Sequence, residues 1–456
     1  MTTVTANPRA FVVWFKDLDR WDVAYFRRIQ WTWPAAVLRP LGEALVRKTR
    51  EVDTKSDKVV VPIIEKISFG GDVSLTDPEN RAKYKGRLYW AEAGELVYSK
   101  IRVKQGSLAI VPPAMSRLAV SAEYPIYAIK PSVADGEYLV LVLKSRAFQS
   151  FLEGLSHGGS TKTRLHPTEF ERLTVPLPPL AAQRAIVRRW QEAQDEIAKS
   201  NDAIRKRQDD LEATLLRKIG IRLLPPTPRT GALGFYWKDI ERWDTFFYRP
   251  DFVDLEKQLT AQKARPLGEL AHFVSRPWSK ADFPDGVFRY VEISCVSREK
   301  GIADARPVDV QKAPSRATTL IKTGDILLST TRPYLGAFTI VPTDYDNCVC
   351  TSGFAVADAV DEMRVDKRFL LHFLKGPAGL RQMERRMTGG LYPAIVQSEL
   401  EKVRLPLPPL KVQQNFVTEA EKVQEQIKKD RQAAAKLSAE VAQEVEEMIL
   451  GTRPVR

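Results

Sequence analysis

The sequence is poor in the residues that most metal centres and redox sites use. Its 456 residues include three cysteines and four histidines, and the histidines at positions 157, 166, 272 and 372 share no metal-ligand spacing such as HExxH. Cys295 stands alone, while Cys348 and Cys350 alternate within a strand-like run. No second cysteine pair completes a four-ligand zinc site, so we expect buried, reduced thiols and no metal.

Motifs for nucleotide chemistry are also missing. The chain contains no G-x-x-x-x-G-K-[ST] phosphate loop and no G-x-G-x-x-G after a strand. The Asn-Pro-Pro-aromatic motif that receives a flipped base in amino-methyltransferases is absent as well. The sequence therefore predicts no catalytic residues in this chain.

Long hydrophobic runs are absent. No purely apolar run is longer than Tyr138–Leu143, which is far shorter than a membrane span, and the N-terminus carries no basic-then-apolar export signal. Hydrophobic residues make up 44% of the chain, as in ordinary globular proteins. We expect a cytoplasmic protein.

Positive charge is what the sequence has in excess. It contains 70 Lys+Arg against 57 Asp+Glu, a net charge of +13, and residues 1–173 have the largest share with 26 basic and 19 acidic residues. Such a balance favours a polyanionic partner.

A proline motif occurs twice and precedes a long helical pattern each time. Val175–Gln183 reads VPLPPLAAQ, and Leu405–Gln413, 230 positions later, reads LPLPPLKVQ. The prolines favour an extended backbone before each helix. Apolar residues then recur at heptad spacing, Ile186, Trp190, Ala193, Ile197, Ile204 and Leu211 in the first helix and Phe416, Ala420, Val423, Ile427, Ala434, Leu437, Val441 and Met448 in the second.

Neither predicted helix can bury its apolar stripe alone. About forty residues at 1.5 Å each make a rod of roughly 60 Å. Antiparallel pairing of the two rods would bury both stripes and hold the preceding globular domains at opposite ends.

Two further motifs recur before each globular domain. DRWDVAYFR at Asp19–Arg27 returns as ERWDTFFYR at Glu241–Arg249, a pattern in which an ion pair can flank a buried indole. RPLGEAL at Arg39–Leu45 returns as RPLGELA at Arg265–Ala271, and we expect short helix-like segments there.

A third correspondence aligns without a gap. Gly94–Pro112 lies over Gly324–Pro342, with Arg102 matching Arg332 between two predicted strands. Such a hairpin can hold an arginine out on a rigid frame. Surface solubility and contact with a polyanion both remain open for each arginine, and the matched positions favour contact.

A helical segment follows in each half, from Tyr138 in the first and from Arg368 in the second, and each leads to a glycine-containing loop. Glycines allow backbone N–H groups to approach a phosphate or a groove edge closely, although a flexible connection is the alternative. The candidates are Gly158, Gly159, Ser160, Thr161, Lys162 and Arg164 in the first loop and Gly389, Gly390 and Tyr392 in the second.

These observations predict an α+β protein built twice on one plan. Two β-rich globular domains, residues 1–173 and 225–403, alternate with two long-helix segments, residues 174–224 and 404–456, each beginning with the proline motif. We expect an antiparallel coiled coil of the two helices and an internal pseudo-two-fold repeat.

The duplicated proline motif with its heptad helix, the repeated RWD-aromatic segment and the glycine loop closely resemble the specificity subunit of Type I restriction-modification systems. That resemblance covers nearly the whole chain. It implies a non-catalytic subunit in which each globular domain is a target-recognition domain for one half of a bipartite DNA site. It also implies that the helix pair sets the spacing and that methyltransferase subunits, two in number, dock there with restriction/translocase subunits. S-adenosylmethionine would be bound by the methyltransferase partner, not by this chain.

The resemblance directs attention to basic and polar residues around the strands and turns, which would hold phosphates or read base edges in double-stranded DNA. In the first domain these candidates are Arg81, Lys83, Lys85, Arg87, Lys100, Arg102 and Lys104. In the second domain they are Arg276, Trp278, Lys280, Arg298, Lys300, Arg332 and Tyr334.

Two other functions remain open at this point. One is a DNA methyltransferase with an unfamiliar active site, and the other is a coiled-coil scaffold that binds only proteins. The scaffold would leave both β-rich domains without a role.

Overall fold

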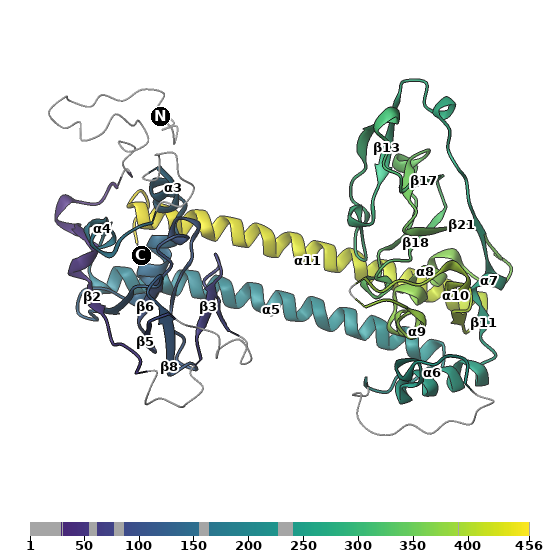
Figure 1. Ribbon diagram of the computed structural model, residues 1–456, viewed down its shortest axis with the longest axis horizontal. Helices are drawn as coiled ribbons and strands as arrows, with labels where there is room; N and C mark the ends of the chain where they lie inside the picture. Colours follow the sequence, from purple (N-terminus) through teal and green to yellow (C-terminus); the bar gives the residue numbers. More distant parts are fainter. Residues whose placement is uncertain are drawn as a thin grey trace. The chain divides into compact units, whose positions relative to one another are not determined.

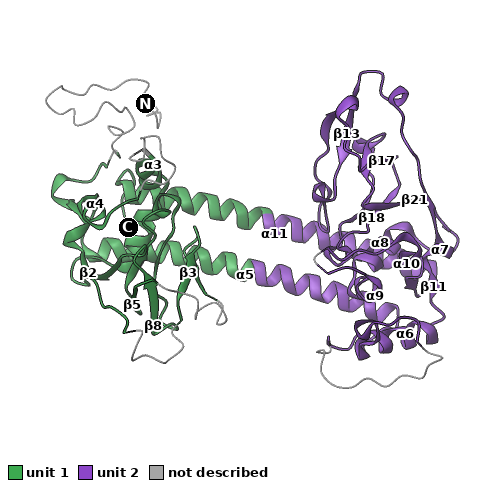
Figure 2. Cartoon of the chain, in the orientation of Figure 1, with its two compact units in different colours: residues 1–200, 432–456 green, residues 201–431 purple. Residues whose placement is uncertain are grey.

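The computed structural model describes residues 29, 31–53, 62–76, 86–154, 164–226, 240–390 and 392–455. Helices and strands occur in both halves of the chain (Figure 1). Contacts divide it into two compact units, residues 1–200 with 432–456 (unit 1) and residues 201–431 (unit 2) (Figure 2). Both long helices contribute one part to each unit.

Unit 1 is built on a four-stranded antiparallel sheet in the order β2-β9-β6-β7. Two-stranded pairs β5-β8, β3-β4 and β1-β10 lie beside it in the same unit. The strands are β1 (Leu38–Pro40), β2 (Leu45–Lys48), β3 (Ile64–Ile67), β4 (Val73–Leu75), β5 (Leu88–Glu92), β6 (Leu96–Tyr98), β7 (Leu108–Ile110), β8 (Arg117–Ser121), β9 (Ile126–Ile129) and β10 (Thr174–Pro176).

The helices of unit 1 are α2 (Gly136–Lys144), α3 (Arg146–Gly154), α4 (Pro167–Arg172) and the first part of α5 (Leu180–Lys218). Asp135 caps α2 by accepting from two backbone N–H groups. The buried face of α2, including Tyr138 and Val142, shares one core with Tyr98 of the sheet and with Ile186 of α5.

Unit 2 contains a four-stranded sheet in the order β12-β21-β18-β19 and a second one in the order β16-β13-β20-β17. Its strands are β11 (Arg265–Pro266), β12 (Ala271–Val274), β13 (Val287–Val291), β14 (Val296–Ser297), β15 (Gly301–Ile302), β16 (Arg306–Asp309), β17 (Ala317–Leu320), β18 (Ile326–Ser329), β19 (Phe338–Ile340), β20 (Val349–Thr351), β21 (Phe354–Val360) and β22 (Arg404–Leu405). In the first sheet, β12-β21-β18-β19, the first strand in the chain lies at one edge beside the last strand, as in the unit 1 sheet β2-β9-β6-β7.

The helices of unit 2 are α6 (Pro250–Ala261), α7 (Leu267–Leu270), α8 (Lys367–Lys375), α9 (Pro377–Arg386) and α10 (Gln397–Leu400), together with α5 from residue 201 onward and residues 410–431 of α11 (Leu410–Leu450). Phe369 and Phe373 of α8 are fully buried against Phe416 of α11. The helix pair thus shares the core of this domain.

The predicted long helices are present, and their apolar stripes face inward. Ile186, Ala193 and Ile204 of α5 and Phe416 and Ala420 of α11 are all nearly inaccessible to solvent. Within unit 1, Arg189 of α5 pairs with Glu444 of α11. Within unit 2, Arg207 pairs with Asp430 and Lys218 with Glu419. Within unit 2 the higher-numbered α5 residue meets the lower-numbered α11 residue, so these two segments run antiparallel there.

The helical segment predicted after each hairpin is two helices in the structure. Between α8 and α9 the break falls at Gly376-Pro377, because a proline cannot continue a helix but suits the first turn of the next one. Between α2 and α3 it falls at Ser145, and the first N–H groups of α3, those of Arg146 and Ala147, donate to the Glu446 carboxylate of α11 at 2.9 and 2.8 Å.

Each repeated RPLGE segment begins as a short β-strand and continues as a helical turn. Arg39 of β1 pairs with Val175, and Arg265 of β11 pairs with Leu405, so each segment hydrogen-bonds to the start of a proline motif. A helical turn follows in both copies, a 3-10 turn at Leu41–Glu43 and α7. The helix-like expectation therefore holds only for the second part of each segment.

The expectation of a buried indole in the RWD segment is wrong for the second copy. Trp243 is 81% exposed, because the aromatic residues that follow it, Phe247 and Tyr248, occupy the interior position instead. The first copy, Asp19–Arg27, lies outside the described residues.

Two of the three cysteines are buried as expected, and Cys295 is half-buried. Cys350 lies in β20 and Cys348 just before it, both buried, and burial raises the pKa of the Cys350 thiol to about 12. Over the ranges that the structure describes, no three His, Cys, Asp or Glu side chains gather in a way that could hold a metal ion. No described helix is long and apolar enough to cross a bilayer.

Candidate nucleic-acid interface

Two loops that are far apart in the sequence lie together in unit 2. The residues after β18 pair with the residues after Tyr392: Arg332 N–H donates to the Pro393 carbonyl, and Ile395 N–H donates to the Thr330 carbonyl, both at 2.8 Å. The Arg332 guanidinium lies 5.0 Å above the Tyr392 ring, a cation-π distance. The hairpin arginine and the glycine loop therefore form one surface, which we call the loop pair.

The loop pair carries exposed aromatic and apolar side chains beside a cation. Tyr392 is 72% exposed, Leu335 55% and Tyr334 41%. Exposed aromatic rings next to arginine can stack on bases and hold phosphates, which is how many nucleic-acid-binding surfaces work. Gly390 beside them faces open space.

The backbone of the loop pair requires unusual conformations. Arg332 has φ +47° and ψ +53°, a left-handed conformation that costs energy for a residue other than glycine. Gly389 has φ +97°, where a Cβ would also come within 3.1 Å of the Tyr392 carbonyl. These conformations fix the direction in which Arg332 and Tyr392 face.

Unit 1 places its hairpin in a similar way. Leu165 N–H donates to the Lys100 carbonyl at 2.9 Å, as Ile395 does to Thr330 in unit 2. Arg102 is exposed in the turn between β6 and β7. Lys100 Nζ donates to the Ala122 carbonyl at 2.6 Å, and Arg164 lies 3.4 Å from Glu123.

The remaining first-domain candidates are only partly described. Arg87 is exposed and lies 3.9 Å from Glu51, and Lys104 is half-buried in the turn after Arg102. Arg81, Lys83, Lys85, Gly158, Gly159, Ser160, Thr161 and Lys162 lie outside the described residues.

Several second-domain candidates instead hold the domain together. Arg276 makes ion pairs with Asp325 and Asp358, and its hydrogen bonds to Asp325 are the largest cause that raises its pKa. Trp278 packs in a small core and donates its indole N–H to the Ala317 carbonyl at 2.7 Å. Lys280 donates to Gln311 at 3.1 Å.

Arg298 fastens the domain to the helix pair of unit 2. Its guanidinium donates to Glu212 of α5 at 2.6 Å and to the Lys375 carbonyl at 2.8 Å. The adjacent Glu299 accepts from Arg431 of α11 at 2.7 Å. The loop that carries Arg298 and the exposed Lys300 thus contacts both long helices.

The proline motif owes its rigidity to its last residue, which sequence reasoning did not single out. Gln183 is fully buried, and its amide accepts from Asp135 N–H at 2.8 Å and donates to the Val133 and Pro178 carbonyls at 3.0 and 2.7 Å. In unit 2, Gln413 accepts from Asp366 N–H at 2.9 Å and donates to the Arg364 and Pro408 carbonyls. The signal was present as an identical glutamine at one position of both copies.

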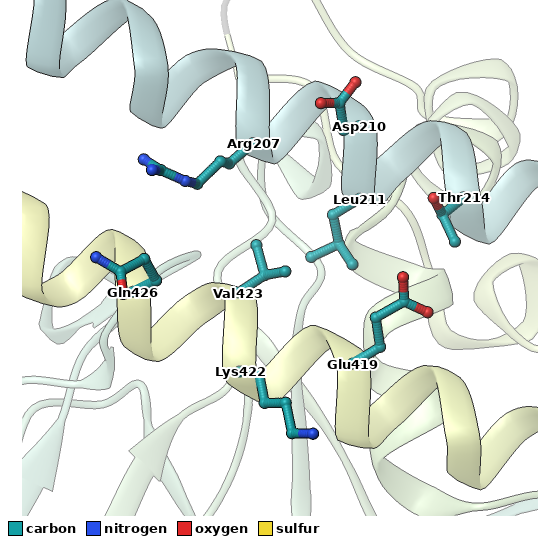
Figure 3. Close-up of a pocket in the computed structure, with 8 residues that line it drawn as sticks. All are labelled: Arg207, Asp210, Leu211, Thr214, Glu419, Lys422, Val423 and Gln426. Carbon is teal, nitrogen blue, oxygen red and sulfur yellow. The ribbon is translucent and has the colours of Figure 1, made fainter.

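The two long helices leave a groove between them within unit 2. It has a volume of about 350 Å³ and is lined by Arg207, Asp210, Leu211, Thr214, Glu419, Lys422, Val423 and Gln426 (Figure 3). Figure 3 shows Leu211 of α5 and Val423 of α11 pointing toward one another, with charged side chains on both helices around them. This groove is polar at its edge and offers no cluster of catalytic groups.

Comparison with known proteins gives the class of this architecture. Residues 263–437 match the family model described as "Type I restriction modification DNA specificity domain". This range holds β12 to β22, the loop pair and a large part of α11. A search of the curated proteins returned no match.

Among solved structures, the chain is similar to one described as "Structural basis underlying complex assembly and conformational transition of the type I R-M system", with a TM-score of 0.54 at 17% identity over 90% of this chain and 96% of that chain. Two further matches are an HsdS subunit from Thermoanaerobacter tengcongensis (TM-score 0.38, 19% identity, 90% and 95% covered) and a Type I restriction-modification S subunit from M. genitalium (TM-score 0.44, 12% identity, 93% and 97% covered).

The fold and the family match define a DNA-recognition protein built from helices and strands. Residues 263–437 match the DNA specificity domain of Type I restriction-modification systems, and a solved structure of such a system shares the fold over most of the chain. This match supports recognition of DNA and gives no support to the first alternative from the sequence, a DNA methyltransferase.

Proposed function

We propose that this chain reads a bipartite double-stranded DNA site, one half with each globular domain. The observation that carries the proposal is the loop pair, in which the half-buried Arg332 and the exposed Tyr392 form one cationic and aromatic surface at the end of a buried hairpin. Lys100 and Arg102 in the matched hairpin of unit 1 support the same role for the first domain.

In this proposal, residues 1–173 and 225–403 are the two target-recognition domains. Residues 174–224 and 404–456 are the spacer segments between them. The shared strand order of the sheets β2-β9-β6-β7 and β12-β21-β18-β19 supports an internal pseudo-two-fold repeat. The buried heptad residues, the α5–α11 ion pairs and the antiparallel run of these helices in unit 2 support a coiled coil that fixes the distance between half-sites.

The proposed assembly contains two methyltransferase subunits, together with restriction/translocase subunits, docked on this chain. S-adenosylmethionine would be bound by the methyltransferase partner, because this chain is a recognition component. The exposed charged side chains along α5 and α11 support the helix pair as the docking platform. We place this activity in the cytoplasm, where the DNA target lies.

Methylation mapping of the host genome with and without this chain tests the proposal. We expect methylation at one asymmetric two-part sequence, present only when the chain is expressed. The same sequence placed in a short duplex should bind the purified complex more tightly than random DNA, with an affinity that falls steeply as salt rises. Equal binding to both duplexes would refute sequence recognition.

A further inference from the structure

The turn between β14 and β15, residues 298–300, joins the globular domain of unit 2 to the long helices of the same unit. On the domain side, Val296 and Ile302 flank this turn and are buried in one core with Leu327 of β18. Strands β18 and β19 form the hairpin whose turn contains Arg332. The turn at 298–300 is therefore rooted in the same hairpin that presents the loop pair.

The Arg298 side chain reaches from that hairpin to α5. Its aliphatic part lies over Gly336, where an added Cβ would come within 3.1 Å of Arg298 Cγ. Gly336 has φ +66°, a conformation that favours glycine. The Arg298 guanidinium donates to Glu212 of α5 at 2.6 Å and to the Lys375 carbonyl at 2.8 Å. One side chain thus connects the turn that contains Arg332 with a long helix.

A second ion pair joins the same turn to the other long helix. The Glu299 carboxylate accepts two hydrogen bonds from the guanidinium of Arg431 in α11, one of them at 2.7 Å. A two-point contact of this kind fixes the orientation of the two groups as well as their distance. Lys375 at the end of α8 donates to the Arg298 carbonyl at 2.8 Å and so holds the backbone of the turn. We call the two ion pairs, Arg298 with Glu212 and Glu299 with Arg431, the latch.

The sequence made Arg298 a candidate for contact with DNA, but its guanidinium is already bound by a carboxylate and a backbone carbonyl. The charge of Arg431 is likewise matched by Glu299. A phosphate could bind either arginine only if it replaced a partner that lies in the same unit. The geometry therefore favours a positioning role for Arg298 over direct contact with DNA.

The turn at the matching place in unit 1, residues 68–72 between β3 and β4, lies against Gly106 as the latch turn lies against Gly336. Lys144 of α2 donates to the Gly70 carbonyl in that turn. Within the described residues of unit 1, no ion pair joins this turn to α5 or α11. The ionic connection between hairpin and long helices is thus a property of the second domain.

The latch acts on orientation more than on stability. Both ion pairs are partly exposed, with side-chain exposures between 36% and 49%, and such pairs stabilise a fold only slightly. Because they reach two different helices, however, the hairpin cannot tilt on the helices without breaking one of them. Orientation matters for a two-part DNA site, since one extra base pair in the gap moves the second half-site by about 3.4 Å and turns it by roughly 35°.

We propose that Arg298 and Glu299 are positioning residues that fix the angle at which the second domain meets its half-site. The latch thereby narrows the range of gap lengths that this chain accepts. The inference rests on the proposed reading of a bipartite site and adds a device to it. The length of the helices sets the preferred gap, and the latch sets how strictly that gap is required.

The test uses the purified complex of the full-length chain and the site found by methylation mapping, in duplexes with the natural gap or with one base pair more or less. Fluorescence anisotropy measures the gap preference, which is the ratio of the affinities for the natural and the altered gap. The main variant, Glu212→Gln with Arg431→Gln, changes only the helix side of the latch, so Arg298 and Glu299 stay available to DNA.

The matched control is Asp209→Asn with Lys429→Gln, which removes one charge of each sign from exposed positions of the same two helices. A reversed ion pair, Glu299→Arg with Arg431→Glu, is compared with Arg431→Glu alone, which places two carboxylates together. Thermal unfolding of each variant checks that the fold is unchanged.

We expect E212Q/R431Q to lower the gap preference roughly three- to tenfold, in keeping with the loss of two partly exposed ion pairs. Base discrimination within the second half-site should change less than twofold, because the hydrogen bonds of the loop pair remain. The control should behave as wild type, and E299R/R431E should regain the preference that R431E loses.

An unchanged gap preference in E212Q/R431Q overturns the latch, and so does an equal decrease in D209N/K429Q. A reversed pair that restores nothing overturns it as well. Loss of base discrimination together with gap preference assigns these residues to the folding of the loops and also refutes positioning. A wild-type complex that binds every gap equally overturns the proposed bipartite site itself, whereas a wild-type preference that the latch variants keep overturns only the latch.

Discussion

The Gln183 side chain accepts a hydrogen bond from Asp135 N–H at 2.8 Å and thereby joins the start of α5 to the residue that caps α2. Gln413 makes the matching bond to Asp366, the capping residue of α8, at 2.9 Å. The glutamine that closes each proline motif therefore fixes a long helix to its globular domain. The prolines direct the backbone, and the amide holds it in place.

Replacement of this amide should destabilise the domain that carries it. In Gln413→Ala, the Asp366 N–H and the Arg364 and Pro408 carbonyls lose their partner inside the protein, which costs about 2–4 kcal/mol. Thermal or urea unfolding measures the loss. Gln414→Ala is the matched control, because Gln414 is exposed on the same helix turn. Equal stability of the two variants would contradict the joint.

Removal of the exposed aromatic ring of the loop pair should weaken DNA recognition without affecting the fold. Stacking of one base on an aromatic side chain contributes about 1–3 kcal/mol, so Tyr392→Ala should bind cognate DNA roughly 5- to 150-fold more weakly. Fluorescence anisotropy with cognate and random duplexes measures this. Met363→Ala, on an exposed turn of the same unit, should leave both affinities unchanged.

Loss of the Arg332 charge should be visible in the salt dependence of binding. If Arg332 contacts a phosphate, Arg332→Gln lowers the slope of log affinity against log salt by about 1 and weakens binding to all sequences alike. If it reads a base instead, the slope stays and discrimination falls at one position of the site. An unchanged slope with unchanged discrimination would remove Arg332 from the interface.

A shorter first helix should change the spacing between half-sites. Deletion of one heptad within α5 removes about 10 Å of helix and preserves the apolar stripe. The preferred gap should then change, or binding should be lost, in a library of duplexes with gaps of different lengths. Alanine replacement of the exposed residues of the same heptad serves as the control, and an unchanged gap after the deletion would exclude the spacer role.

Acid should destabilise unit 2 through His372. Burial against Phe416, with further contributions from the neighbouring Lys375, lowers the pKa of His372 to about 4. Since the unfolded chain has a histidine pKa of about 6.5, the neutral ring favours folding fully above pH 6.5, and this contribution decreases as the pH falls toward 4. Asp366 and Glu421 oppose the shift, and Arg368 adds to it.

Urea unfolding between pH 7.5 and 4.5 should show a decrease of up to about 3 kcal/mol from this group. The variant His372→Phe, which keeps a ring beside Phe416, should flatten the pH dependence in this range. His272→Phe is the control, because His272 is exposed and pairs with Asp358. A decrease that is equally steep in H372F would assign the effect to other groups.

Sequence patterns between near neighbours in the chain predicted the long helices and the hairpins, because heptad spacing and turn residues each specify one local structure. The heptad spacing predicted the inward face of α5 and α11, since a helix of that length can hide its apolar stripe only against another surface. The predicted residues that are buried are Ile186, Ala193, Ile204, Phe416, Ala420, Ile427, Val441 and Met448, and those that are half-buried are Trp190, Ile197, Leu211, Val423, Ala434 and Leu437. The aligned hairpins also formed, as β6-β7 and β18-β19, because alternating apolar residues and a glycine at the turn specify a hairpin locally.

Residue type alone could not assign roles to individual cations and aromatic rings. Arg276 and Arg332 are both arginines near strands, but Arg276 is held by Asp325 and Asp358, while Arg332 lies over an exposed tyrosine. The difference depends on carboxylates 49 and 82 positions away from Arg276 and, for Arg332, on pairing between two loops. No local sequence pattern contains either relationship.

The sequence by itself determined the repeated plan, the long helices, the absence of catalytic motifs and the family that they resemble. The tertiary structure decided that Gln183 and Gln413 lock the proline motifs, that the Arg332 and Tyr392 loops form one surface, and that Trp243 lies outside. The spacing of apolar residues and the turn residues act between near neighbours in the chain, so the sequence alone shows which helices and hairpins they specify. Burial and hydrogen-bond pairing join distant residues, so they become known only once the chain is folded.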